Sequence, residues 1–238
     1  MYIEKAYILR TQNPTSIEYS EISAKTCDAI GLPYEFFEGY DHKELKKNKI
    51  NLWDEVGKTI DVPKGLKRND GGSCATAGHF LIWKKILDNK ECAVVLEHDA
   101  LMLHKLTLDI PDNQLVVLGY KVTDPHKYFH EYAGPPEEIL DRKKHGGAHA
   151  YALTYKTAET FLDNIKDSKG DISYIDNQFF FGTQKRGKVT MGITNPICAI
   201  GWLRDSTIWK KSAVDNYGPI LPSFLEHYYS KNDMGVKK

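Results

Sequence analysis

Apolar residues along this chain fall into short continuous runs that alternate with longer segments of helical periodicity. A run of four to six residues rich in Val, Ile, Leu or aromatic side chains is typical of a strand buried inside a sheet. Such runs predict strands at 6–9, 34–37, 93–96, 115–118, 148–153 and 189–193. The periodic segments predict helices at 14–30, 75–87 and 157–165.

The predicted helices are marked by their ends and by one apolar face. Asn13-Pro14 provides an N-cap residue followed by Pro at the first helical position, and Gly31 ends that segment. The helix at 75–87 has a wide apolar face. Two polar stretches are weakly periodic or rich in Pro and His, and we predict loops there: 41–70, with a short helix near 52–56, and 124–145.

Alternation of strands and helices predicts an α/β fold with a mostly parallel central sheet and helices on both faces. We find no internal repeat and no linker, so residues 1–238 are expected to form a single domain. From Tyr217 on, two prolines and four aromatic residues replace the regular pattern. We therefore predict that 211–238 forms an irregular C-terminal cover.

Composition narrows the class of protein. Hydrophobic residues make up 41% and charged residues 27% of the chain, which is ordinary for a globular protein. The formal net charge is zero, so no global field favours a nucleic-acid partner, and none is expected. No apolar stretch reaches the ~18–20 residues of a membrane span, and no N-terminal signal pattern is visible. Four cysteines lack paired metal spacing, which favours free thiols and a cytoplasmic location.

Two acids follow the apolar run at 93–96 directly. Ligands of open α/β sheets bind beyond the carboxyl ends of strands, where Glu97 and Asp99 lie. On an extended chain the two side chains point the same way, ~6–7 Å apart, and repel by roughly 2–3 kcal/mol at an effective dielectric of about 20. A Mg²⁺ or Mn²⁺ ion would offset this repulsion. Acids also end strands where a chain turns into solvent, so the pair alone leaves both interpretations open.

Several segments, in order and spacing, resemble glycosyltransferase family 25, which includes lipooligosaccharide and collagen galactosyltransferases. The family's helix usually reads Cys-x-x-Ser-His with Trp four residues later, and its next strand ends in Leu-Glu-Asp-Asp-Ala. The resemblance covers roughly residues 1 to 210, and its segments are 3–10, 30–37, 75–83, 95–100 and 147–151. The chain departs from the family pattern at three points. His98 replaces the middle acid of Glu-Asp-Asp, Gly78 replaces the Ser before His79, and the first-strand motif lacks its Asn.

The resemblance implies a GT-A-like, Rossmann-type domain that transfers a hexose from a UDP-sugar, with inversion, to a hydroxyl acceptor. The donor would be UDP-galactose or UDP-glucose, and the cofactor Mn²⁺ or Mg²⁺. The acceptor would be a glycan, a lipid-linked saccharide or a protein hydroxyl. Asp99 would be the first metal ligand, and Glu97 a second ligand or a ribose contact. Arg10, Thr11 and His79 would bind the donor nucleotide.

An inverting displacement needs a base for the acceptor proton. Asp176 falls where the family has an Asp after the helix at 157–165, and Asp171 is the reserve candidate. Asp176 could instead cap a helix that begins near Asn177. His98 is expected to point to the other strand face, where it is structural or a third ligand, and His79 and Arg10 also have structural interpretations.

Two other classes of function stay open. A histidine-based metal hydrolase would use His126, His130, His145 and His149. His126 and His130 are four residues apart, a spacing that places two imidazoles on one face of a helix. However, prolines bracket this pair, and no His-Glu-x-x-His order is present. The substitution at His98 also fits a catalytically silent relative that only binds a sugar nucleotide or glycan. Trp202 and Trp209 could form a sugar-stacking platform or belong to the core.

Overall fold

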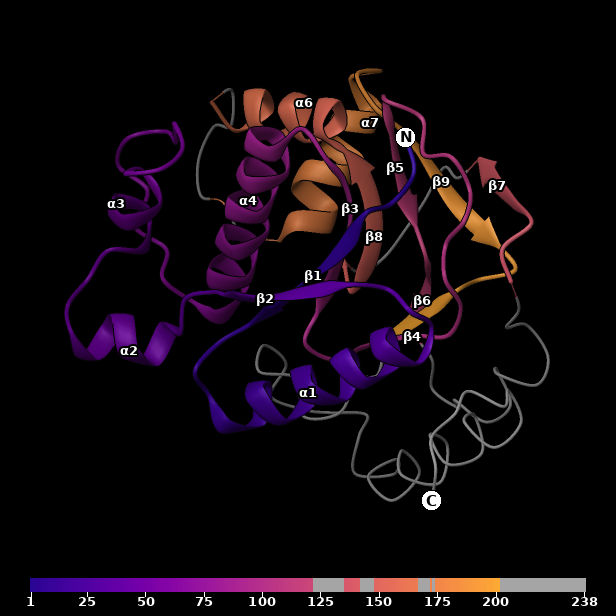
Figure 1. Cartoon of the computed structure of the whole chain (residues 1–238). Helices are drawn as coiled ribbons and strands as arrows, with labels where there is room; N and C mark the ends of the chain where they lie inside the picture. Colours follow the sequence, from indigo (N-terminus) through magenta and orange to yellow (C-terminus); the bar gives the residue numbers. More distant parts are fainter. Residues whose placement is uncertain (122–134, 142–147, 167–171, 173, 202–238) are drawn as a thin grey trace.

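A seven-stranded sheet forms the centre of the protein (Figure 1). The computed structural model describes residues 1–121, 135–141, 148–166, 172 and 174–201. Strands β1, β2, β3, β5 and β9 run in one direction, while β8 and β7 run antiparallel to their neighbours. In spatial order the strands are β2 (Tyr34–Glu38), β1 (Lys5–Arg10), β3 (Cys92–Glu97), β8 (Ala150–Thr154), β5 (Gln114–Val117), β9 (Thr190–Asn195) and β7 (Glu138–Asp141).

Both faces of this sheet are apolar. Successive residues of a strand point to opposite faces, so a continuous apolar run supplies apolar side chains to both. Tyr7 and Val95 belong to the core cluster beneath α4 (Gly71–Asn89) and α6 (Tyr155–Lys166). Ala6 and Val94 belong to the cluster that includes residues of α1 (Pro14–Ala29), on the other face (Figure 1). The predicted α/β class, with a mostly parallel sheet and helices on both faces, is confirmed, as expected of a GT-A-like domain.

Helix α4 begins at Gly71, four residues before the predicted start. The Asp70 side chain caps it by accepting a hydrogen bond of 2.8 Å from the backbone N–H of Ser73. Gly72 packs against the ring of Tyr174, where a Cβ would lie 3.0 Å from Cε1. The sequence pattern does not predict this first turn, because Gly71 and Gly72 have low helix propensity. The Asp70 cap and the Tyr174 contact stabilise it in the structure.

The segment 41–70 contains one helix more than predicted. Helix α3 (Leu52–Val56) lies where we expected it, but α2 (His42–Lys47) precedes it. Asp41 caps α2 by accepting a hydrogen bond of 2.7 Å from the backbone N–H of Lys43. The sequence contains a capping signal for this helix, Asp41 with Glu44 three residues later, although we predicted a loop here.

Four strands fall outside the predicted set. Strand β7 lies within 124–145, predicted as loop, and is paired to β9 at the sheet edge. A second sheet of three short strands consists of β4 (Ala100–Met102), β10 (Ala199–Gly201) and β6 (Gly119–Lys121). Strands of three residues are too short to show a period of two. The predicted C-terminal cover at 211–238 lies outside the described residues.

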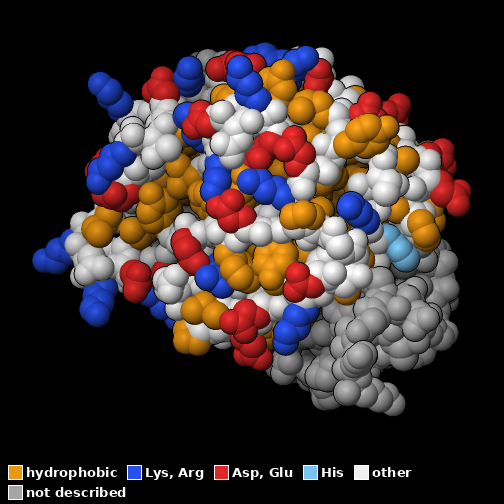
Figure 2. Space-filling model, in the orientation of Figure 1, with side chains coloured by type: hydrophobic (Ala, Val, Ile, Leu, Met, Phe, Trp, Pro, Cys, Tyr) orange, Lys and Arg blue, Asp and Glu red, His pale blue; other side chains and the backbone are white. Residues whose placement is uncertain are grey.

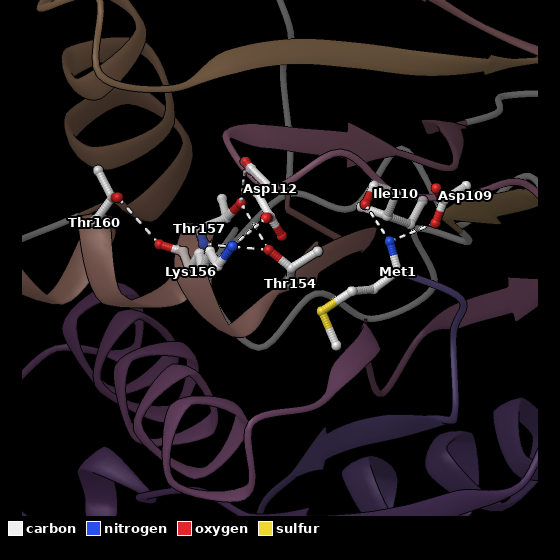
Figure 3. A network of polar contacts seen from close by, with 8 residues as sticks. All are labelled: Met1, Asp109, Ile110, Asp112, Thr154, Lys156, Thr157 and Thr160. Carbon is white, nitrogen blue, oxygen red and sulfur yellow. Dashed lines mark hydrogen bonds and ion pairs between the residues drawn. The ribbon is translucent and has the colours of Figure 1, made fainter.

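Polar contacts close the edge where the parallel strands begin (Figure 3). The Met1 ammonium group donates a hydrogen bond of 2.8 Å to the Ile110 carbonyl oxygen and pairs with Asp109. Lys156, in the first turn of α6, donates a hydrogen bond of 2.6 Å to Asp112. These contacts join the start of the chain and the segment before β5 to one edge, opposite the carboxyl ends of β1 and β3.

All four cysteines are free and buried in the core. Burial raises the pKa of each thiol to about 12, for Cys27, Cys74, Cys92 and Cys198. The thiols therefore stay protonated and pack as small apolar groups.

Surface charges are mixed in sign on the visible face. Figure 2 shows basic and acidic side chains interspersed on this face of the described part of the chain. Among the described helices, none is both long and apolar enough to cross a membrane.

The close approach of β6 to β10 leads to a stability prediction. A Cβ at Gly119 would lie 1.7 Å from the carbonyl oxygen of its register partner Ala199. Gly119→Ala must push these strands apart, so we expect the free energy of unfolding to fall by about 1–3 kcal/mol in urea denaturation. Gly182→Ala on α7 (Phe181–Lys185) is the control, because its added methyl would meet only Arg186, at 3.7 Å. Equal stability of Gly119→Ala and wild type would contradict this packing.

Candidate functional site

The predicted acid pair lies where the chain passes from the large sheet to the small one. Strand β3 ends at Glu97, His98 and Asp99 form a turn, and β4 begins at Ala100. Glu97 pairs in register with Leu9 of β1, whereas Ala100 pairs with β10. The prediction that the two acids share one extended strand is therefore wrong, because the chain must turn between two sheets. The separation expected for an extended strand does not apply.

The turn lies at the carboxyl edge of the parallel strands. The strands β1, β2 and β3 end in register, with Arg10 opposite Glu38 and Leu9 opposite Glu97. Helix α1 begins at Pro14, shortly after β1 ends, and α4 starts at this same edge because its other end leads into β3. This is the edge at which open α/β sheets bind ligands.

A buried chain of side chains reaches Glu97 from α4 and β8. The Trp83 Nε1–H group donates a hydrogen bond of 2.9 Å to the Tyr151 hydroxyl oxygen. That oxygen lies 2.8 Å from His79 Nδ1, and His79 Nε2 lies 3.4 Å from Glu97 Oε1. His79, Trp83 and Tyr151 are fully buried, and burial raises the pKa of Tyr151 well above its ordinary value. We expected His79 to bind the donor. In the structure, both of its ring nitrogens contact protein atoms.

His98 reaches the other side of the strand end. Its ring stacks on Tyr19 of α1, with centroids 6.3 Å apart and an interplanar angle of 11°. Glu97 meets α4 while His98 meets α1, as expected for neighbours that point to opposite faces. Asp99, the next residue, is buried at 9% exposure.

Arg10 and Thr11 lie at the same edge, at the end of β1. The Arg10 Nε–H group donates a hydrogen bond of 2.6 Å to Glu38, and the guanidinium lies 3.9 Å from the Phe36 ring centroid. The Thr11 backbone N–H group donates a hydrogen bond of 3.0 Å to the Ser16 hydroxyl. Arg10 thus already has a protein partner, although guanidinium groups carry further N–H donors.

Asp176 is the first residue of the short helical segment η1 (Asp176–Phe180). This segment is anchored by two buried aromatic rings. Phe180 packs edge-on against Tyr151 at 5.1 Å between centroids, and Phe179 packs against Phe80 at 4.7 Å. The segment therefore lies on the α4 side of the sheet, beside the side chains that reach Glu97. Asp171 lies outside the described residues.

The described residues contain no cluster of three or more His, Cys, Asp or Glu side chains able to hold a metal ion. His149 is buried, with its ring against Gly201, where a Cβ would lie 2.7 Å from its Cγ. The other residues of the histidine-based alternative and of the proposed stacking platform lie outside the described part: His126, His130, His145, Trp202 and Trp209. The described residues give the hydrolase alternative no support.

The hydrogen-bond partners of His79 are not predictable from the sequence pattern. The sequence predicts Trp83 within the helix at 75–87 and Tyr151 within the strand at 148–153, and indicates a polar role for neither. A buried Tyr or Trp normally finds a hydrogen-bond partner. That rule is a usable signal, but it does not identify the partner, because 72 residues separate His79 from Tyr151.

Several solved glycosyltransferase structures are similar to this chain at low sequence identity. The structure is similar to a glycosyltransferase involved in glycosylation of the major capsid of PBCV-1, with 7% identity, TM-score 0.44, and coverage of 83% of this chain and 93% of that one. It is also similar to galactosyltransferase LgtC in complex with donor and acceptor sugar analogs, with 12% identity, TM-score 0.39 and 95% coverage of both chains. Mouse xyloside xylosyltransferase 1 gives 9% identity, TM-score 0.39, and coverage of 79% and 84%. No curated protein sequence matches significantly.

The model of glycosyltransferase family 25, described as LPS biosynthesis protein, matches residues 15–178. The matched region contains α4, β3, the turn at His98–Asp99, β8 and Asp176. The chain belongs to glycosyltransferase family 25.

Proposed function

We propose that this protein transfers a hexose, galactose or glucose, from a UDP-sugar to a hydroxyl acceptor, with inversion and with the help of a divalent cation. The observation that supports this best is the position of Glu97 and Asp99 at the carboxyl edge of β3, inside the family match. The acceptor would be the hydroxyl of a glycan, a lipid-linked saccharide or a protein.

Asp99 and Glu97 are the residues proposed to hold Mn²⁺ or Mg²⁺. Carboxylate oxygens are the ligands these cations prefer, and such ions commonly bind through one or two carboxylates, with water and substrate phosphates completing the coordination. Two acids at one turn fit that demand. When bound, the cation would stabilise the negative charge that develops on the departing diphosphate.

The donor is proposed to lie along the edge between β1 and β3. Arg10 and Thr11, at the end of β1, would contact the uridine or the phosphates. Arg10 can do so while it stays bound to Glu38 through Nε, because its Nη groups carry further donors. The Glu38 contact and the Phe36 ring would then fix the direction of the guanidinium.

Asp176 is the proposed base. The acceptor oxygen attacks the anomeric carbon, the bond from that carbon to the phosphate oxygen breaks, and UDP leaves. The acceptor hydroxyl proton passes to the Asp176 carboxylate. The anchoring of η1 by Phe179 and Phe180 would hold this carboxylate on the α4 side of the site.

Removing one ligand charge tests the metal assignment. Asp99→Asn keeps the shape of the side chain, so we expect transfer to be lost and UDP binding to become independent of Mn²⁺, with Glu97→Gln less severe. Product formation and calorimetric titration of UDP measure the two effects. Asp112→Asn, at the opposite edge, is the control. Near-normal activity of Asp99→Asn would remove the metal assignment, whereas metal-dependent binding without turnover in the wild type would favour the silent relative.

Asp176→Asn separates a base from a helix cap. As base, Asp176 acts only in the transfer step, so kcat should fall by roughly 10²–10⁴-fold while donor affinity stays within a few-fold. As a cap, the substitution would be nearly silent, because Asn caps about as well as Asp. Asp163→Asn, exposed on α6, is the control. A wild-type rate for Asp176→Asn would move the base to Asp171 or to another residue.

A further inference from the structure

The buried chain from Trp83 through Tyr151 and His79 to Glu97 has a definite direction. An indole N–H group only donates, so the Tyr151 oxygen accepts from Trp83. The Tyr151 hydroxyl keeps its own proton, because burial raises its pKa well above the ordinary value. Among the described residues, the remaining contact of this hydroxyl is His79 Nδ1, at 2.8 Å. The hydroxyl therefore donates to Nδ1.

This direction selects one tautomer of His79. Because Nδ1 accepts, a neutral ring must carry its proton on Nε2, the nitrogen that lies 3.4 Å from Glu97 Oε1. The other tautomer would leave the Tyr151 proton without an acceptor and turn a ring lone pair toward a carboxylate. Each of these would leave a buried polar group without a hydrogen-bond partner, which disfavours that tautomer.

We propose that His79 is a positioning residue for Glu97 and that Tyr151 and Trp83 set its tautomer, so that an Nε2–H group holds one carboxylate oxygen at the carboxyl edge of β3. The proposal rests on the proposed function, in which Glu97 serves the cation or the donor. It replaces the expected direct contact of His79 with the donor, because the His79 side chain is fully buried.

The position of the ring also depends on packing. Tyr151 is wedged between His79, at 5.6 Å between ring centroids, and Phe180, at 5.1 Å. Trp83 stacks on Phe161 of α6 at 4.7 Å. Rings held in this way leave the imidazole little freedom, so the Nε2–H group stays directed at Glu97. Groups that orient a metal-binding carboxylate in this manner commonly change metal affinity or activity 10–100-fold when removed.

The first experiment observes the tautomer directly in the wild-type protein. Long-range ¹H–¹⁵N correlation spectra of ¹⁵N-histidine-labelled protein distinguish a ring protonated on Nε2 from one protonated on Nδ1, and His79→Gln identifies the signal among nine histidines. We expect the proton on Nε2 and none on Nδ1, the nitrogen that accepts from Tyr151. A proton on Nδ1 would overturn the proposal, whether or not the protein transfers sugar.

The second experiment removes the hydroxyl that sets the tautomer. Tyr151→Phe keeps the ring, so we expect the Mn²⁺ concentration for half-maximal UDP binding to rise about 10–100-fold, while metal-free UDP binding stays unchanged. Tyr7→Phe is the matched control: it removes another buried hydroxyl, bonded to Glu91 at the opposite edge. Calorimetric titration of UDP at a series of Mn²⁺ concentrations, with melting temperatures alongside, measures both variants.

A rescue distinguishes positioning from general loss of stability. The side-chain amide of His79→Gln can offer an N–H group in place of Nε2–H without any tautomer to set. We expect its Mn²⁺ dependence to stay within a few-fold of wild type and to be insensitive to added Tyr151→Phe, whereas His79→Leu should match Tyr151→Phe. Unchanged Mn²⁺ dependence in Tyr151→Phe and His79→Leu would overturn the positioning role. Wild-type protein without metal-dependent UDP binding would overturn the proposed function and this role together, whatever the tautomer.

Discussion

Burial of β3 on both faces is the constraint on which the rest of the structure depends. Val95 packs beneath α4 and Val94 lies in the core cluster of the α1 face, so polar side chains are excluded until the strand ends. The acids therefore appear at the first position where the chain can turn, between the two sheets. On the α4 side, Glu97 contacts the fully buried His79 ring, with 3.4 Å between Glu97 Oε1 and His79 Nε2.

Close approach of α4 to β1 places that imidazole. A Cβ at Gly78 would lie 2.6 Å from Leu9 Cδ1, so glycine lets the helix lie directly on the Leu9 side chain. His79 follows immediately and meets the end of β3, which is the neighbour of β1. The serine usual in the family at this position would need Leu9 to move. We interpret the departure at Gly78 as fitted to Leu9, while His98 is fitted to the Tyr19 ring of α1.

Most strands of the large sheet, and the helices that cover it, could be predicted from the sequence. Apolar runs such as 93–96 and caps such as Asn13 are local signals. The small sheet could not, since its three-residue strands show no period and pair residues about a hundred positions apart, as in Ala199 and Met102. The family, and the sheet edge at which the site lies, could be predicted from sequence motifs. The turn at Asp99 and the hydrogen bond from Tyr151 to His79 did not, because both depend on how distant segments pack.

The central claim is that the carboxyl edge of β3 binds a nucleoside diphosphate through a divalent cation. The most direct measurement is the melting temperature of the wild-type protein with UDP, with Mn²⁺ and with both. Ligand at about 100 times its dissociation constant stabilises the native state by roughly 2.7 kcal/mol, which is about 5–10 °C for a chain of this size. We predict such a rise with UDP and Mn²⁺ together and little with either alone. An equal rise with UDP alone, or no rise under any condition, would contradict the account.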